Sequence, residues 1–162
     1  MPAQKPGKSR QDYCSPPELL TALKRKLGIL YFDIDLAASG ENTVAEGFYT
    51  EKENALVQPW GVLAGGWGYC NPPYANIKPW VEKAYYETDI HGAQTAMLVP
   101  ASVGANWWQD WVHHHAYVLF MNGRVTFVGE TTGYPKDTAI LLYSPMTIGD
   151  GGYSVWNWHD KE

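Results

Sequence analysis

The tetrapeptide Asn-Pro-Pro-Tyr at residues 71–74 constrains the fold of this chain more than any other stretch of its sequence. Proline has no N–H group, and each proline pushes the residue before it into an extended conformation. The tetrapeptide therefore cannot continue a helix, and its carbonyl groups remain available as acceptors. Residues 69–70 predict the end of a short strand, and residues 77–86 predict a helix. The tetrapeptide is thus predicted at the end of a strand, where α/β proteins bind their ligands.

The side chains of the tetrapeptide present hydrogen-bond acceptors and a flat ring without any charge. The Asn71 side-chain oxygen and the Pro72 carbonyl accept hydrogens, and the Tyr74 ring suits a planar ligand or a cationic sulfur. An amino group on an aromatic ring fits this site, because its two hydrogens meet two acceptors. Its lone pair then turns toward an electrophile such as a sulfonium methyl group, and no general base is needed beforehand. A Pro-Pro loop without a catalytic role is the alternative interpretation.

A capped helix is predicted on the amino-terminal side of the tetrapeptide. Ser15 is its predicted N-cap, Pro16 suits the first helical position, and Glu18 completes a capping box. The leucines of residues 19–27 follow at helical spacing, which predicts one buried face. The start of such a helix is also a binding site for a carboxylate group.

The next predicted element is a buried strand that begins at residue 29 and ends in acidic and then small residues. Asp33 and Asp35 stand near its carboxyl end, and Ala37 and Ala38 follow. Small residues leave room for a ligand, so this stretch is predicted to hold a cofactor, although a glycine-rich dinucleotide signature is missing. The remaining predicted elements are a helix at 105–115, strands at 95–100, 116–120, 124–128 and 139–143, and an edge strand within 149–162.

The length of 162 residues and the 45% hydrophobic content predict one compact domain at 12–162 behind a flexible basic tail at 1–11. No apolar run is long enough to cross a bilayer and no leader is recognisable, which predicts a soluble cytoplasmic protein without a membrane partner. Cys14 and Cys70 lack the spacing of a disulfide framework or a zinc site. The histidines at 113–115 are predicted at the surface, and no metal is expected.

The charge of the chain is divided unevenly between its beginning and the rest. A net charge of −5 argues against strong general binding of nucleic acid, because phosphate contacts need Lys and Arg. The first 26 residues hold six basic and two acidic residues, a net charge of +4, which leaves −9 for the remainder. One face of the protein is therefore predicted to be basic, with a merely solvated tail as the alternative.

The tetrapeptide and the order of the segments around it resemble the small DNA adenine-N6 methyltransferases of phages and prophages, in which Asn-Pro-Pro-Tyr is the catalytic motif. The resemblance extends from Asp12 to about Tyr143. It implies a Rossmann-like α/β fold that depends on S-adenosylmethionine and methylates N6 of an adenine flipped out of double-stranded DNA. It also implies the cytoplasm of a bacterial host, a role in protection from restriction and a short recognition sequence such as GATC. A monomer is favoured over an oligomer.

The resemblance implies roles for individual residues. Ser15 and Pro16 match a segment that touches the amino-acid end of the cofactor, and Asn54 stands where the family contacts the cofactor's adenine. Asp35 matches the acidic position of the first cofactor motif, with Asp33 as the alternative. The implied catalytic residues are Asn71, Pro72, Pro73 and Tyr74. The implied cofactor-binding residues are Asp12, Ser15, Pro16, Asp33, Asp35, Ala37, Ala38 and Asn54. The predicted DNA-binding residues are Arg124, Lys5, Lys8 and Arg10.

Three other functions stay open at this point. Methyltransferases that act on an RNA base or on a glutamine amide of a protein share the tetrapeptide. The third alternative is an inactive module that binds DNA or a nucleotide. Cytosine-N4 methyltransferases are disfavoured, because their motif usually begins with Ser or Asp.

Overall fold

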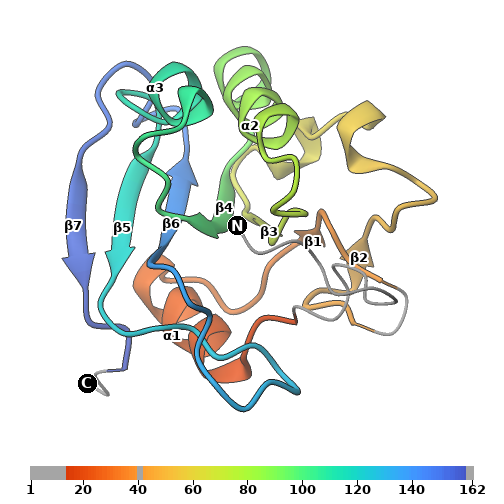
Figure 1. Cartoon of the computed structure of the whole chain (residues 1–162). Helices are drawn as coiled ribbons and strands as arrows, with labels where there is room; N and C mark the ends of the chain where they lie inside the picture. The colour runs from red at the N-terminus through yellow and green to blue at the C-terminus, as the bar shows by residue number, and fades with distance from the viewer. Residues whose placement is uncertain (1–13, 40–41, 160–162) are drawn as a thin grey trace.

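The computed structural model describes residues 14–39 and 42–159, and it shows a mixed α/β fold built on one seven-stranded sheet (Figure 1). The strands lie in the order β2-β1-β3-β4-β6-β5-β7. The helices are α1 (Pro17–Leu27), α2 (Lys78–His91) and α3 (Asn106–Trp111), with short 3₁₀ helices η2 (Ala55–Val57) and η3 (Gly61–Leu63). The strands are β1 (Ile34–Asp35), β2 (Gly47–Phe48), β3 (Gly68–Cys70), β4 (Thr95–Pro100), β5 (Tyr117–Met121), β6 (Thr138–Tyr143) and β7 (Tyr153–Trp156).

The sheet is parallel on one side and mixed on the other. Strands β2, β1, β3 and β4 are all parallel, and β6 runs antiparallel between β4 and β5. Strand β7 adds to β5 as a parallel edge strand. The chain runs from β1 to β2 on one side and then returns to β3 on the other side of β1. This reversal opens a crevice at the carboxyl ends of β1 and β3.

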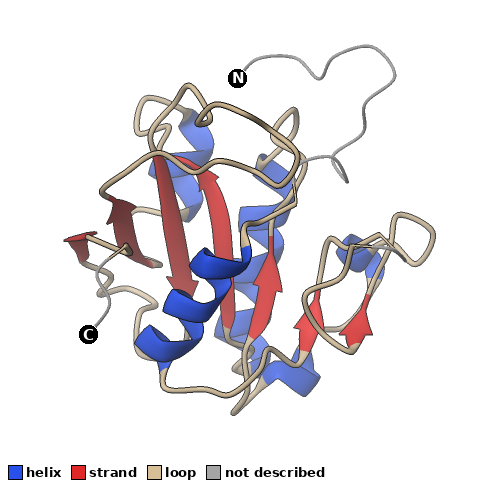
Figure 2. Ribbon diagram, turned by 90° about the horizontal axis from the view of Figure 1, so that it is seen from below, coloured by secondary structure: helices blue, strands red, loops and turns tan. Residues whose placement is uncertain are grey.

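Helices cover both faces of the sheet. Helix α1 lies on one face, and α2 and α3 lie on the other (Figure 2). Leu19 and Leu23 of α1 are fully buried because they share one side of the helix. Helix α1 ends at Gly28, which has a φ of 70°, and α2 ends at Gly92, which has a φ of 73°. Glycine adopts this left-handed conformation readily, so both helices stop where the sequence provides it.

Several predicted elements are confirmed. Strand β4 has the predicted bounds, β6 adds one residue to its prediction, and β3 precedes the tetrapeptide as expected. Helix α2 is longer than predicted and continues to His91, and the predicted edge strand within 149–162 is β7. Helix α3 is shorter than predicted, because the chain turns at His114, which has a φ of 67°.

Two predicted strands are wrong in part or whole. Residues 29–33 are not a strand, and Leu30 is 91% exposed. The segment that would pair with them bends at Gly65, which has a φ of 82°, so pairing starts only at Ile34. Residues 124–128 show the predicted alternation of burial but no strand. Both edges of β5 are already taken by β6 and β7, so no edge of that strand is left for this segment.

The predicted capping box is also wrong. The N-cap of α1 is Pro16, which has no side chain able to cap the helix, and Pro17 occupies the first turn. The Ser15 hydroxyl instead hydrogen-bonds the Tyr69 hydroxyl at 2.6 Å. A buried partner on β3 thus replaces the backbone amides that a capping serine would bind.

Two further observations concern membrane-spanning helices and the predicted boundary between tail and domain. Within residues 14–39 and 42–159, no helix is both long and apolar enough to cross a membrane. The division into a tail at 1–11 and a domain at 12–162 falls outside the described residues, and so do Lys5, Lys8, Arg10 and Asp12.

Gly68 is the position at which the fold should be most sensitive near the tetrapeptide. A Cβ atom there would stand 2.7 Å from Leu63 Cδ1, and Leu63 is fully buried. We expect Gly68→Ala to lower the free energy of unfolding by about 1–3 kcal/mol, because a packed core resists an added methyl group. Urea unfolding of Gly68→Ala and Gly104→Ala measures this, since Gly104 has open space around it. Equal unfolding midpoints would contradict the packing.

Candidate active site

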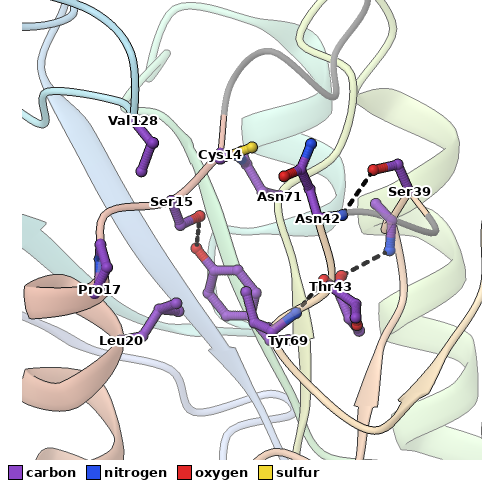
Figure 3. Close-up of a pocket in the computed structure, with 13 residues that line it drawn as sticks. Cys14, Ser15, Pro17, Leu20, Ser39, Asn42, Thr43, Tyr69, Asn71 and Val128 are labelled. Atoms are coloured by element: carbon purple, nitrogen blue, oxygen red, sulfur yellow. Dashed lines mark hydrogen bonds between the residues drawn. The ribbon is translucent and has the colours of Figure 1, made fainter.

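A cavity of about 300 Å³ opens at the carboxyl ends of β1 and β3, where the strand order reverses (Figure 3). Asp35 is the last residue of β1, and Asn71 follows the last residue of β3. Both line the cavity because parallel strands end at the same edge of a sheet. The complete lining is Cys14, Ser15, Pro17, Leu20, Asp35, Ala37, Ser39, Asn42, Thr43, Val44, Tyr69, Asn71 and Val128.

Asp35 organises the loop that forms one wall of the cavity. Its side chain is 4% exposed, and one carboxylate oxygen accepts from the Ala37 amide at 3.2 Å. The other oxygen accepts from the Val44 amide at 3.0 Å. Hydrogen bonds from backbone amides to a carboxylate are charge-assisted and strong. Asp35 therefore ties both ends of the β1–β2 connection to the end of β1.

The hydroxyls of Ser15 and Tyr69 join α1 to β3 across the cavity (Figure 3). The Tyr69 side chain is 1% exposed. Burial raises the pKa of the Tyr69 phenol well above its usual range, and the hydrogen bond with Ser15 opposes this only in part. The phenol stays protonated at any physiological pH, so its role is a structural hydrogen bond between neutral groups and not that of a general base.

A second cavity lies beside the tetrapeptide. Asn71 lines the first cavity, whereas Pro73 lines a cavity of about 360 Å³ that also reaches Asn54. The Asn76 amide donates to the Pro73 carbonyl at 3.2 Å, which turns the chain toward α2. Pro72 is buried beneath the turn. Both cavities therefore reach the tetrapeptide.

Tyr74 does not line either of these cavities. Its ring is 8% exposed and packs edge-to-face against Phe127 and Tyr134, with centroid distances of 6.4 and 5.6 Å. The rings of Phe127 and Tyr134 also pack edge-to-face on each other at 5.8 Å. The tetrapeptide's aromatic ring is thus enclosed by the connection between β5 and β6.

The structure brings together only part of the predicted cofactor set. Ser15, Asp35 and Ala37 surround the first cavity with Asn71. Ala38 is buried, with 1% exposure, and lies outside that lining. The remaining predicted residues lie elsewhere: Pro16 caps α1, Asn54 lines the second cavity, and Asp12 lies outside the described residues.

Asp33 lies apart from Asp35, although only Ile34 stands between them in the sequence. Its carboxylate accepts from the Trp67 amide at 2.9 Å and lines a crevice with Glu46 and Gly47. Residues two positions apart in a strand point to the same face, but Asp33 precedes β1 and lies at its amino end. The two carboxylates therefore hold two different loops.

Arg124, the predicted DNA contact, is exposed at the start of the connection from β5 to β6. Its Nε atom lies 3.2 Å from a carboxylate oxygen of Asp137, and both side chains are largely open to solvent. Its Nη1 atom donates to the Tyr134 carbonyl at 3.4 Å. Arg124 therefore holds the two ends of this connection together.

Sequence reasoning missed Tyr69 and Val128 as neighbours of the site. Tyr69 stands two residues before Asn71, and the two-residue period of a strand places such residues on the same face, so a signal was present. Val128 reaches the cavity because its amide donates to the Cys14 carbonyl at 3.0 Å. No local pattern in the sequence indicates that long-range contact.

Comparisons with known proteins identify the family and the relatives of this chain. Residues 3–147 match the family described as DNA N-6-adenine-methyltransferase (Dam). A protein of Escherichia phage T1 with the name DNA N-6-adenine-methyltransferase is 29% identical over 142 residues, which are 88% of this chain and 58% of that protein. A protein of Haemophilus phage HP1 with the same name is 27% identical over 144 residues, 85% of this chain and 82% of that protein.

The chain thus spans 58% of the length of the phage T1 protein and 82% of the length of the phage HP1 protein. The family match extends over nearly all of the chain and contains the cavity, the tetrapeptide and the β5–β6 connection. The protein belongs to the DNA N-6-adenine-methyltransferase (Dam) family.

Proposed function

We propose that this protein transfers a methyl group from S-adenosylmethionine to N6 of an adenine in double-stranded DNA. The observation that carries the proposal is that Asn71 shares one cavity with Asp35. Asn71, a neutral acceptor for an amine, and Asp35, the acidic residue that anchors the β1–β2 connection, thus lie at the ends of neighbouring strands. Membership in the Dam family supports the same reaction.

The proposal includes a Rossmann-like fold for a single methyltransferase domain at residues 12–162. Four parallel strands, β2, β1, β3 and β4, with a reversal between β1 and β3, support it. Doubly wound sheets bind their ligands at such a reversal, outside the carboxyl ends of the strands. The cavity lies at that place.

The residues around the cavity suit S-adenosylmethionine. When bound, this cofactor supplies a methyl group on a positively charged sulfur. Asp35 places a negative charge at the cavity, which favours a ligand with an ammonium group and a sulfonium. Apolar Leu20 and Val128 and polar Ser15 and Thr43 all line this space, so both the aliphatic and the amino-acid part of the ligand find matching side chains.

Asn54 is proposed to hold the adenine ring of the cofactor from the second cavity. Its side-chain oxygen accepts from the Leu56 amide at 3.2 Å, so the NH₂ group is directed to other acceptors. An adenine ring offers such acceptors at its nitrogens. The roles of Asp12, Pro16, Ala37 and Ala38 in this binding stay predictions.

Asn71 and Pro72 are proposed to prepare the target adenine. The Asn71 side-chain oxygen and the Pro72 carbonyl accept the two hydrogens of the exocyclic amine. This arrangement turns the nitrogen lone pair toward the cavity. An adenine within a duplex must first leave the base stack, and Tyr74 is the ring proposed to stack on it afterwards.

Basic residues are proposed to hold the DNA backbone. Arg124 is exposed near the tetrapeptide's aromatic partner, and the last turn of α1 carries three consecutive basic residues, Lys24, Arg25 and Lys26. Lys5, Lys8 and Arg10 would add to this charge. Since the named relatives are phage proteins, the proposed place of action is the cytoplasm of a bacterial host.

Asp35 is expected to be needed for binding of the cofactor. Asp35→Ala removes the acceptor of the Ala37 and Val44 amides and releases the loop beside the cavity. Charge-assisted hydrogen bonds are strong enough that we expect S-adenosylmethionine affinity to fall by about tenfold or more. Titration calorimetry measures this, and circular dichroism checks that the variant is folded. Asp33→Ala is the matched control; a loss confined to Asp33→Ala would reverse the assignment.

Asn71 is expected to be needed for turnover and not for binding of the cofactor. Asn71→Ala removes an acceptor that strengthens as charge develops on the amine, and such a loss costs roughly a hundredfold or more in turnover. Asn71→Asp keeps an acceptor at the same reach and should retain part of the activity. Transfer of a tritiated methyl group to unmethylated plasmid DNA measures both, with calorimetry as the binding control. Parental turnover in Asn71→Ala would mean that the tetrapeptide is only a turn.

A further inference from the structure

The enclosure of Tyr74 conflicts with its proposed role in stacking on an adenine. Stacking requires an open ring face, but the Tyr74 side chain is only 8% exposed. The cavities beside Asn71 and Pro73 do not extend to Tyr74. The two rings that cover it, Phe127 and Tyr134, belong to the β5–β6 connection and not to the tetrapeptide. Something must therefore move before a base can reach Tyr74.

Residues 128–137, which we call the strap, contain the movable cover. Tyr134 is the one buried residue of the strap, and its neighbours on both sides are exposed or half-buried. Phe127 precedes the strap and belongs to the hydrophobic core. The strap contains Gly129, with a φ of 89°, and Gly133, which lies against the Arg124 side chain. The Tyr134 ring is thus the buried contact of the strap with Tyr74. Backbone hydrogen bonds also hold the strap: the Val128 amide donates to the Cys14 carbonyl at 3.0 Å, the Tyr134 amide to the Val125 carbonyl at 2.7 Å, and the Ala101 amide to the Asp137 carbonyl at 2.9 Å.

Arg124 and Asp137 keep the strap closed. The Arg124 guanidinium binds the Tyr134 carbonyl and the Asp137 carboxylate, with distances of 3.4 and 3.2 Å. The Arg124 and Asp137 side chains are 51% and 79% exposed, so this ion pair is weak on its own and open to competition. A DNA phosphate binds a guanidinium with the same bidentate geometry as a carboxylate.

We propose that the strap is a gate over the adenine site, in which Tyr134 covers Tyr74 until a DNA phosphate draws Arg124 away from Asp137. This inference rests on the proposed function. Without DNA, Tyr134 holds the place on Tyr74 that the flipped adenine takes. Binding of the DNA backbone and access of the adenine to Tyr74 are thereby coupled, because Arg124 binds either the DNA phosphate or the strap.

The gate predicts that loss of the cover favours productive binding of DNA. A protein whose open state is rare binds more weakly by the fraction that is open. Tyr134→Ala should therefore lower the apparent KM for unmethylated plasmid DNA by about two- to tenfold, the equilibrium factor of one aromatic ring pair. Tyr134→Phe keeps the ring and should stay within about twofold of the parent. A higher KM or a lower kcat in Tyr134→Ala, without a fall in KM, would mean that Tyr134 supports Tyr74 and would overturn the gate.

A second measurement tests the ion pair between Arg124 and Asp137 through the exposed Asp137, and it needs no DNA. Asp137→Asn weakens the ion pair with Arg124, so amide hydrogen exchange in the strap of the full chain should become faster. Asp150→Asn removes the same charge from an exposed acid between β6 and β7, and should leave strap exchange unchanged. Unchanged exchange in Asp137→Asn would overturn the gate. If the parent protein methylates no DNA, the proposed function fails and the gate over an adenine site fails with it, whereas faster strap exchange in Asp137→Asn still shows that the Arg124–Asp137 ion pair holds the strap.

Discussion

The parallel pairing of β1 with β3 is the constraint on which the rest of the site depends. Asp35 stands opposite Tyr69 in this pairing, so the two strands end at the same level of the sheet. The residue that anchors the β1–β2 connection and the residue that begins the tetrapeptide are thereby placed around one cavity. A shift of one residue would turn every side chain of β3 to the other face and remove Asn71 from it.

Three sets of polar contacts hold the segments around the cavity and the tetrapeptide in place. The Asp35 carboxylate fixes the β1–β2 connection through two backbone amides. The Ser15–Tyr69 hydrogen bond fixes the start of α1 against β3. Arg124 closes the β5–β6 connection, which covers the aromatic end of the tetrapeptide. The Asp35 and Ser15–Tyr69 contacts are made by buried residues and suit fixed walls of the cavity. The Arg124 contacts are exposed and suit a connection that moves.

Local patterns in the sequence predicted the elements that depend on local physics. The apolar run of β4 and the prolines after β3 act on their own segments, so their predictions are confirmed. Two of the failures involve competition for partners. Ser15 caps no helix because Tyr69 takes its hydroxyl, and residues 124–128 join no sheet because β5 has no vacant edge. Sequence patterns record burial and turns, but they do not record which edge or hydroxyl is already occupied.

The central claim is that the amine positioned by Asn71 is N6 of adenine in DNA. The most direct test incubates the protein with unmethylated DNA and S-adenosylmethionine that carries a deuterated methyl group, and then analyses the digested nucleosides by mass spectrometry. We expect deuterated N6-methyldeoxyadenosine and no label on deoxycytidine, because the chain belongs to the DNA N-6-adenine-methyltransferase (Dam) family. Label on deoxycytidine alone, or no label on any nucleoside while S-adenosylmethionine binds, would contradict it.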